Sequence, residues 1–257
     1  MMDNFVYVVI RIPKSGSTSL ANMVGETLSN ATVYEMPLDP AAYLGRSLLE
    51  RWRFTRSRLQ NLHRRYGTFS MPTAWQRVAM RVRPGDVITG HIRFGDPILP
   101  SLTQRYITLL RDPVARTLSA YNYSRLNFQS RPAWRQYYRL GPDRAAGRYD
   151  FSGYLSYLDE HRALYGDLTW RFVCGDTVVD DPLTFVRDRY FHIGTIERLE
   201  PFLRGLGEKL GVPVAMRRDN VTAHREATAL KAADRPVFER VFSRDIAIYD
   251  AVRALDG

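Results

Sequence analysis

The sequence predicts an α/β fold in which a mostly parallel central sheet is flanked by helices. Short runs rich in β-branched and aromatic residues alternate with longer segments of helical pattern, which is typical of a parallel sheet covered on both faces. The chain has 257 residues, of which 45% are hydrophobic, and this is enough to bury such a sheet. We therefore expect a single domain that spans residues 1–257.

The β-rich runs predict the strands of this sheet. The first run, Phe5–Ile12, ends in a Pro-Lys-Ser-Gly turn that leads directly into a helical segment. The other runs expected to form strands are Thr32–Met36, Asp86–Ile92, Tyr106–Leu110, Thr169–Val173 and Phe191–Gly194.

The segments between these runs have helical periodicity. Asp112 and Pro113 form a favourable helix start, because aspartate caps the first turn and proline fits its first position. The helices expected are Ser17–Leu28, Ala41–Tyr66, Pro113–Leu126, Phe151–Tyr165, Pro182–Arg189, Arg198–Leu210 and Pro236–Leu255.

Charge and cysteine content limit the function classes. The formal net charge is +10, which favours anionic partners such as nucleotides, nucleic acid, acidic glycans or a membrane surface. The single cysteine, Cys174, excludes a disulfide within the chain and a cysteine-rich zinc site. No apolar stretch reaches the roughly 20 residues of a membrane helix. The apolar run Phe5–Ile10 is followed at once by Arg11, so we expect a first strand and a cytoplasmic protein.

One loop joins the first predicted strand to the first predicted helix, and it reads Pro13-Lys14-Ser15-Gly16-Ser17-Thr18-Ser19. The first N–H groups of a helix and the positive end of its dipole form an anion site. Gly16 lets the backbone approach a phosphate, and Lys14 adds a positive charge. The lysine precedes the only glycine, whereas in the Walker A pattern it follows the second glycine. The loop predicts a phosphate site, and a polar capped turn is the alternative.

A second strand-to-helix junction contains Arg111-Asp112-Pro113 and, further along the helix, Ser119. Ligands of open α/β sheets bind beyond the carboxyl ends of the strands. Arg111 stands at such an end and can hold a phosphate through two parallel hydrogen bonds, while Ser119 supplies a hydroxyl to the same anion. The alternative is that Arg111 pairs with an acidic neighbour and that Ser119 only packs.

Together the two junctions resemble the sulfotransferases that use 3′-phosphoadenosine 5′-phosphosulfate (PAPS). The loop at residues 13–19 is similar to their 5′-phosphosulfate-binding loop, and residues 111–119 are similar to their 3′-phosphate-binding motif. The resemblance is closest to the carbohydrate branch that includes heparan sulfate 2-O-sulfotransferase, and it extends to Gly90-His91 and to residues 191–200. It implies a P-loop-like sulfotransferase fold with helical insertions on the acceptor side, at residues 37–85 and 127–168.

The resemblance implies an enzyme that transfers a sulfuryl group from PAPS to an acceptor hydroxyl. Lys14 would be catalytic, because its charge stabilises the leaving bridge oxygen. A sulfuryl group carries less charge than a phosphoryl group, so we expect no metal requirement. The implied PAPS-binding residues are Lys14, Ser15, Gly16, Ser17, Thr18 and Ser19 at the phosphosulfate and Arg111 and Ser119 at the 3′-phosphate.

His91 is the candidate general base. It follows the predicted strand that should lie beside the phosphate loop, and neutral histidine accepts a proton near neutral pH. Gly90-His91 match a pair that carries the base in the resembling branch, although Thr89 stands in place of a second histidine. Glu35 and Asp96 are the alternative bases.

The implied acceptor is a hydroxylated molecule, namely a sugar in a glycan, glycolipid or glycoside. The aromatic stretch from Tyr121 to Tyr138 is a candidate acceptor surface, with core packing as its alternative. The arginine-rich segment from Arg46 to Arg65 suits an acidic substrate or an anionic membrane surface. Two other functions stay open: a P-loop kinase, and a nucleic-acid-binding protein without enzymatic activity. The kinase would need its lysine after the glycine, and these arginines do not form one continuous stripe, so we expect no nucleic-acid partner.

Overall fold

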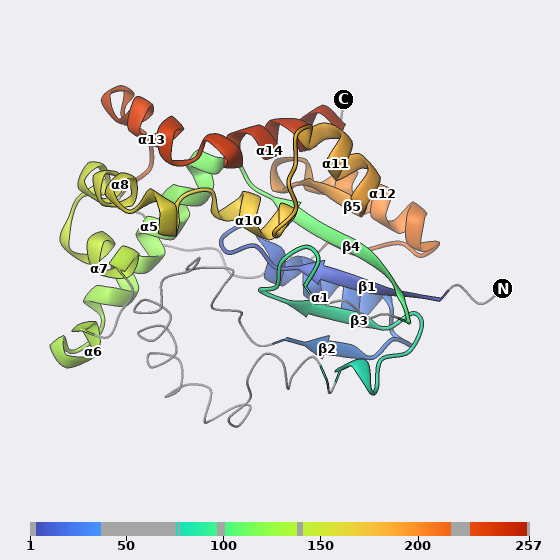
Figure 1. Cartoon of the computed structure of the whole chain (residues 1–257). Coiled ribbons are helices and arrows are strands. Elements are labelled where there is room, and N and C mark those ends of the chain that lie inside the picture. Colours follow the sequence, from blue (N-terminus) through green and yellow to red (C-terminus); the bar gives the residue numbers. More distant parts are fainter. Residues whose placement is uncertain are drawn as a thin grey trace.

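The computed structural model describes residues 4–36, 76, 78–96, 101–137, 141–216 and 227–255. Within these ranges a sheet of five parallel strands has the order β2-β3-β1-β4-β5 (Figure 1). The strands are β1 (Phe5–Ile10), β2 (Val33–Glu35), β3 (Val87–Gly90), β4 (Thr103–Leu110) and β5 (Tyr190–Thr195). The predicted α/β class with a parallel sheet flanked by helices is confirmed.

Side chains alternate between the two faces of the central strand β1, and each face has its own helices. Tyr7 and Val9 pack with α1 (Ser17–Thr27) and α12 (Leu199–Leu210). Val8 and Ile10 pack on the opposite face with α10 (Leu168–Cys174), α11 (Pro182–Arg189) and α14 (Ser243–Leu255). This period of two is the expected pattern of a strand that is buried on both sides.

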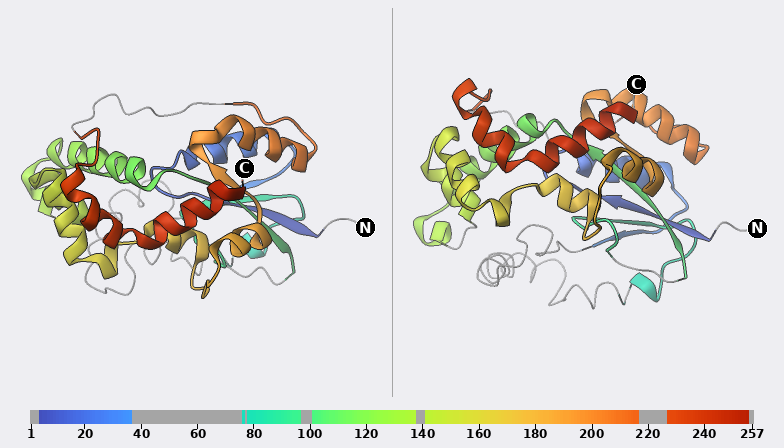
Figure 2. Two further views of the ribbon diagram at one scale, coloured as in Figure 1. Left: turned by 90° about the horizontal axis from the view of Figure 1, so that it is seen from above. Right: turned by 45° about the horizontal axis from the view of Figure 1, so that its top comes forward.

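A cluster of helices lies beyond the carboxyl ends of the strands (Figure 1). Its own apolar core includes Leu118, Leu155 and Phe238. Both views of Figure 2 show α13 and α14 leading from this cluster back along the sheet. The helices of the cluster are α5 (Pro113–Gln129), α6 (Ala133–Tyr137), α7 (Gly141–Arg148), α8 (Phe151–Glu160), α9 (Arg162–Tyr165) and α13 (Arg235–Val241).

One predicted strand is wrong. The run Thr169–Val173 has β propensity, but it forms most of α10. Local propensity is overridden because the helix buries Phe172 and Val173 against the sheet. The Asp245 carboxylate also accepts a hydrogen bond at 2.8 Å from the N–H of Trp170, a first-turn group that has no acceptor within the helix.

Two predicted helices are each divided. Phe151–Tyr165 is interrupted at His161, and Pro236–Leu255 is interrupted at Phe242, so each becomes two shorter helices. The predicted helix Ala41–Tyr66 and most of the segment 37–85 lie outside the described residues. The described part of 127–168 is largely helical. Among the residues described, no helix combines the length and apolar character that a membrane crossing requires.

A buried ion pair connects the helical cluster to the sheet. Nη2 of Arg116 on α5 lies 3.0 Å from a carboxylate oxygen of Asp245 on α14, and both side chains are almost fully buried. The second carboxylate oxygen of Asp245 holds α10 through Trp170. Asp167, just before α10, accepts hydrogen bonds from the backbone N–H groups of Arg244 and Asp245. Three helices that are distant in sequence are therefore fixed at one point.

We predict that Asp245→Ala lowers the free energy of unfolding by about 3–5 kcal/mol, because it leaves the Arg116 guanidinium buried without its counter-charge. Urea unfolding followed by circular dichroism measures this loss. Asp188→Ala removes an exposed pair with Arg187 and serves as the control, with little expected change. Equal stabilities of the two variants would contradict the structural role of the buried pair.

Candidate functional site

The loop between β1 and α1 contains two residues in the left-handed backbone region, Lys14 with φ 67° and Gly16 with φ 77°. A Cβ atom on Gly16 would lie 2.5 Å from Cδ1 of Ile196, so only glycine fits this position without a shift of its neighbours. Lys14 carries a side chain in a conformation that glycine prefers, which is a local strain of the kind that gathers at functional sites. The loop thus turns sharply and places the N-terminus of α1 at the carboxyl end of β1.

The serines of this loop have different environments. The Ser15 and Ser17 hydroxyls are buried, and both donate hydrogen bonds to the carbonyl of Ile12, at 2.9 and 2.7 Å. They shape the loop from inside, so an anion would be held by backbone N–H groups rather than by these hydroxyls. Thr18 is exposed and Ser19 is half-buried on the first turn of α1.

Lys14 is the charged group of the loop. Its ammonium nitrogen lies 3.8 Å from the centre of the Tyr123 ring, which comes from α5. Burial lowers the pKa of the Lys14 amine, and the positive charge of Arg111 lowers this pKa further. Lys14 is therefore held between an aromatic face and a second cation, an arrangement that favours the arrival of an anion.

The second predicted motif meets the first at the carboxyl ends of β1 and β4. These strands are neighbours, and Ile10 is paired with Thr108. Arg111 donates a hydrogen bond from Nη1 to the carbonyl of Lys14, at 3.3 Å. Asp112 caps α5 as expected, since its side chain accepts a hydrogen bond at 2.8 Å from the N–H of Ala115. Ser119 is half-buried further along α5.

A third segment, which directly follows β5, supports both motifs. Ile196 packs beneath Gly16, and the Glu197 carboxylate accepts a hydrogen bond at 3.0 Å from the N–H of Asp112. The sequence similarity at residues 191–200 indicated that this segment matters, but it assigned no role to these two side chains. These two contacts fix the relative position of the two turns.

His91 follows β3, on the other side of β1. Its Nδ1 lies 2.6 Å from the carbonyl oxygen of Arg11. A carbonyl can only accept, so Nδ1 carries the hydrogen and Nε2 keeps its lone pair. This tautomer is the one that a general base at Nε2 requires. Thr89 is buried in β3 and donates a hydrogen bond to the carbonyl of Val9, so it has a structural role.

The two alternative bases are both engaged by arginines. Glu35 forms an ion pair with Arg11 at 3.0 Å, and Asp96 accepts hydrogen bonds at 3.0 and 3.4 Å from Arg93. Both carboxylates therefore contact arginine N–H groups, whereas Nδ1 of His91 contacts a carbonyl oxygen.

Arg11 is a site residue that sequence reasoning missed. One of its terminal nitrogens contacts Glu35, the other donates to Thr18 at 3.3 Å, and its carbonyl orients His91. Its Nε is buried and has no hydrogen-bond partner in the described part of the chain. The only feature of the sequence that could have indicated Arg11 is its position between the end of a strand and the Pro13-Lys14 turn.

The aromatic stretch divides between core and surface. Tyr121 and Phe128 are buried in the helical cluster, whereas Tyr123 and Trp134 are exposed. The Tyr137 side chain and Tyr138 are outside the described residues, as are the arginines from Arg46 to Arg65.

Comparisons with known proteins add no assignment, because no model of a protein family matches the chain and a search of curated proteins finds no match. In the ranges that the structure describes, no group of three or more His, Cys, Asp or Glu side chains lies close enough to hold a metal ion.

We predict that Tyr123→Leu increases the rate at which the Lys14 amine is acetylated by about two- to fivefold, because a cation above an aromatic face favours the protonated form. Tyr123→Phe keeps the ring and should react like the native protein. Peptide mass spectrometry after brief treatment with acetic anhydride measures the rate, with the exposed Lys231 as the internal reference. An unchanged rate in Tyr123→Leu would show that the ring does not act on Lys14.

Proposed function

We propose that this protein is a sulfotransferase that moves a sulfuryl group from PAPS to an acceptor hydroxyl. The observation that carries the proposal is the hydrogen bond from Arg111 to the Lys14 carbonyl, which joins two anion-binding turns at adjacent strand ends. One turn combines a lysine with a helix N-terminus, and the other combines an arginine with a capped helix. Two phosphate groups on one nucleotide match this pair of turns.

The proposed binding roles follow from this arrangement. Backbone N–H groups at the start of α1 hold the 5′-phosphate, and Arg111 and Ser119 hold the 3′-phosphate. Lys14 stabilises the negative charge that develops on the bridge oxygen as the bond from sulfur to this oxygen breaks. Its lowered pKa reflects a poorly solvated amine, and electrostatic interactions are stronger where water is excluded.

His91 completes the proposed mechanism. Nε2 takes the proton of the acceptor hydroxyl as the acceptor oxygen forms its bond to sulfur, and the hydrogen bond from Nδ1 to Arg11 stabilises the resulting imidazolium. The leaving group departs as adenosine 3′,5′-bisphosphate. No step requires a metal ion, whereas a kinase acting through the same loop would need Mg²⁺ and an acidic residue to hold it.

The acceptor is proposed to be a sugar hydroxyl of a glycan, glycolipid or glycoside. The positive charge of the protein supports binding of acidic acceptors and contact with an anionic membrane surface. A cytoplasmic location belongs to the same proposal.

We predict that the protein binds adenosine 3′,5′-bisphosphate in the presence of a chelator. Arg111→Ala should weaken this binding by about 10- to 100-fold, because it removes charge-assisted hydrogen bonds to a phosphate. Lys14→Ala should reduce turnover more than affinity, since its charge is needed most in the transition state. Calorimetric titration measures binding, and the exposed Arg253→Ala is the charge-matched control. No binding at millimolar nucleotide would refute the proposed function.

We predict that His91→Ala reduces turnover by about 10²- to 10⁴-fold and leaves nucleotide affinity unchanged, because His91 is assigned no phosphate. His91→Asn retains a donor for the Arg11 carbonyl but cannot accept the proton of the acceptor hydroxyl, so its turnover should fall as well. Turnover of these variants, together with that of Glu35→Gln and Asp96→Asn, tests the assignment. Native-like turnover in His91→Ala, with loss in either carboxylate variant, would transfer the role of base.

A further inference from the structure

The segment that follows β5 contacts both of the strand-to-helix turns. Ile196 and Glu197 are consecutive residues of the short 3-10 helix η1 (Ile196–Arg198), and they have different partners. The Ile196 side chain lies beneath Gly16, whereas the Glu197 carboxylate accepts a hydrogen bond at 3.0 Å from the N–H of Asp112. Figure 1 shows β5 beside β4, the strand that leads into α5. One short segment therefore reaches each turn through a different side chain.

The hydrogen bond to Glu197 acts on Arg111. The N–H of Asp112 belongs to the peptide group that contains the Arg111 carbonyl, so the carboxylate fixes the orientation of this peptide. The Arg111 side chain donates a hydrogen bond from Nη1 to the carbonyl of Lys14 at 3.3 Å. Arg111 is thus held at its backbone by Glu197 and at its guanidinium by the Lys14 turn. A side chain that is already held in place loses less conformational entropy when it binds a ligand.

Glu197 is itself held by a distant helix. The Tyr249 hydroxyl on α14 hydrogen-bonds to the Glu197 carboxylate, and the Tyr249 side chain is buried. The carboxylate therefore accepts from a backbone N–H at the start of α5 and from a side chain of α14. Hydrogen bonds to an ionised carboxylate are stronger than those between neutral groups. Glu197 is therefore fixed where it meets Asp112, although its own side chain is exposed.

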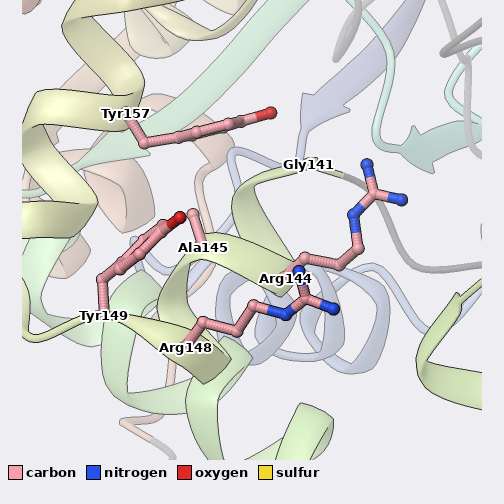
Figure 3. Close-up of a pocket in the computed structure, with 6 residues that line it drawn as sticks. All are labelled: Gly141, Arg144, Ala145, Arg148, Tyr149 and Tyr157. Atoms are coloured by element: carbon pink, nitrogen blue, oxygen red, sulfur yellow. The ribbon is translucent and has the colours of Figure 1, made fainter. Parts of the chain in front are cut away.

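The remainder of α5 is positioned by other contacts. The buried pair of Arg116 and Asp245 holds the helix near its start, and α7 packs on it further along. α8 covers α7 in turn, and Figure 3 shows the Tyr157 ring of α8 beside Gly141 of α7, at the hollow between these two helices. Loss of the carboxylate should therefore loosen the turn at Arg111 and leave the helix in place.

We propose that Glu197 is a positioning residue that makes nucleotide binding selective for a 3′-phosphate, because it holds Arg111 in the orientation that binds this group. The inference rests on the proposed function, which assigns the 3′-phosphate to Arg111. By its charge alone, a carboxylate beside Asp112 opposes the binding of a phosphate. By its hydrogen bond, the same carboxylate supports this binding. The two effects have opposite signs, so substitutions of Glu197 separate them.

Adenosine 3′,5′-bisphosphate and adenosine 5′-monophosphate differ only in the 3′-phosphate, so the ratio of their dissociation constants measures this selectivity. Calorimetric titration with a chelator present gives the constant of the tighter nucleotide, and displacement titration gives that of the weaker one. Glu197→Ala should lower the selectivity about three- to tenfold, because it removes the acceptor of the Asp112 N–H. Glu197→Gln should keep the native selectivity or increase it, because its amide oxygen still accepts this hydrogen bond while the negative charge is lost.

Two further variants locate the effect. Ile196→Val removes the Cδ1 atom beneath Gly16 and should weaken both nucleotides to a similar degree, about two- to fivefold, because both carry the 5′-phosphate. Glu200→Ala removes an exposed acid from the first turn of α12 and should change neither affinity. Thermal melting confirms that each variant is folded.

Three results would overturn the proposal. The first is native selectivity in Glu197→Ala. The second is an equal loss of affinity for both nucleotides in Glu197→Ala, as expected if the acid only stabilises the fold. The third is a selectivity of Glu197→Gln as low as that of Glu197→Ala, which would assign the effect to charge. A native protein that binds neither nucleotide would refute the proposed function and this inference with it, whereas selective native binding that Glu197→Ala retains would refute the inference alone.

Discussion

The buried pair between Arg116 and Asp245 is the constraint on which the arrangement of the site depends. Two charges removed from water are stable only when each is matched, so this contact tolerates little movement of α5 relative to α14. α5 begins at Pro113, two residues after Arg111, carries Tyr123 over Lys14 and provides the surface on which α7 packs. One pair therefore affects the position of the Arg111 turn, the environment of Lys14 and the placement of α7.

The sequence predicted the centre of the sheet well because β1 and β3 are buried on both faces. Such strands read as continuous apolar runs, and the two junctions at Gly16 and Asp112 have strong local signals in glycine and in a capping residue. The strand prediction for Thr169–Val173 was wrong for a different reason. A short apolar run fits a strand or a buried helix equally well, and the partner that decides, Asp245, lies 75 residues away.

The difference between local sequence signals and distant contacts also applies to the site. The meeting of Lys14, Gly16 and Arg111 at neighbouring strand ends was predictable, because each stands in a strand-to-helix turn with a clear local sequence pattern. Ile196, Glu197 and Tyr123 were not, since their importance comes from contacts that exist only after folding: Ile196 beneath Gly16, Glu197 on the N–H of Asp112, and Tyr123 against Lys14. Arg11 belongs to the same class, because nothing local indicates that its carbonyl selects the tautomer of His91.

The energetics of the loop support the proposed binding of an anion. Lys14 has a positive φ, lies in a partly buried environment that lowers its pKa, and is near the charge of Arg111. Each of these features costs free energy in the protein alone. An anion between Lys14 and Arg111 would reverse two of them, because it screens the repulsion between the cations and restores the preference of the amine for its protonated form. The strain at φ 67° remains, and it is compensated by the packing of Ile196 and the inward hydrogen bonds of Ser15 and Ser17. The loop is therefore already ordered in the protein alone, so little of the free energy of binding the proposed anion would be spent on ordering it.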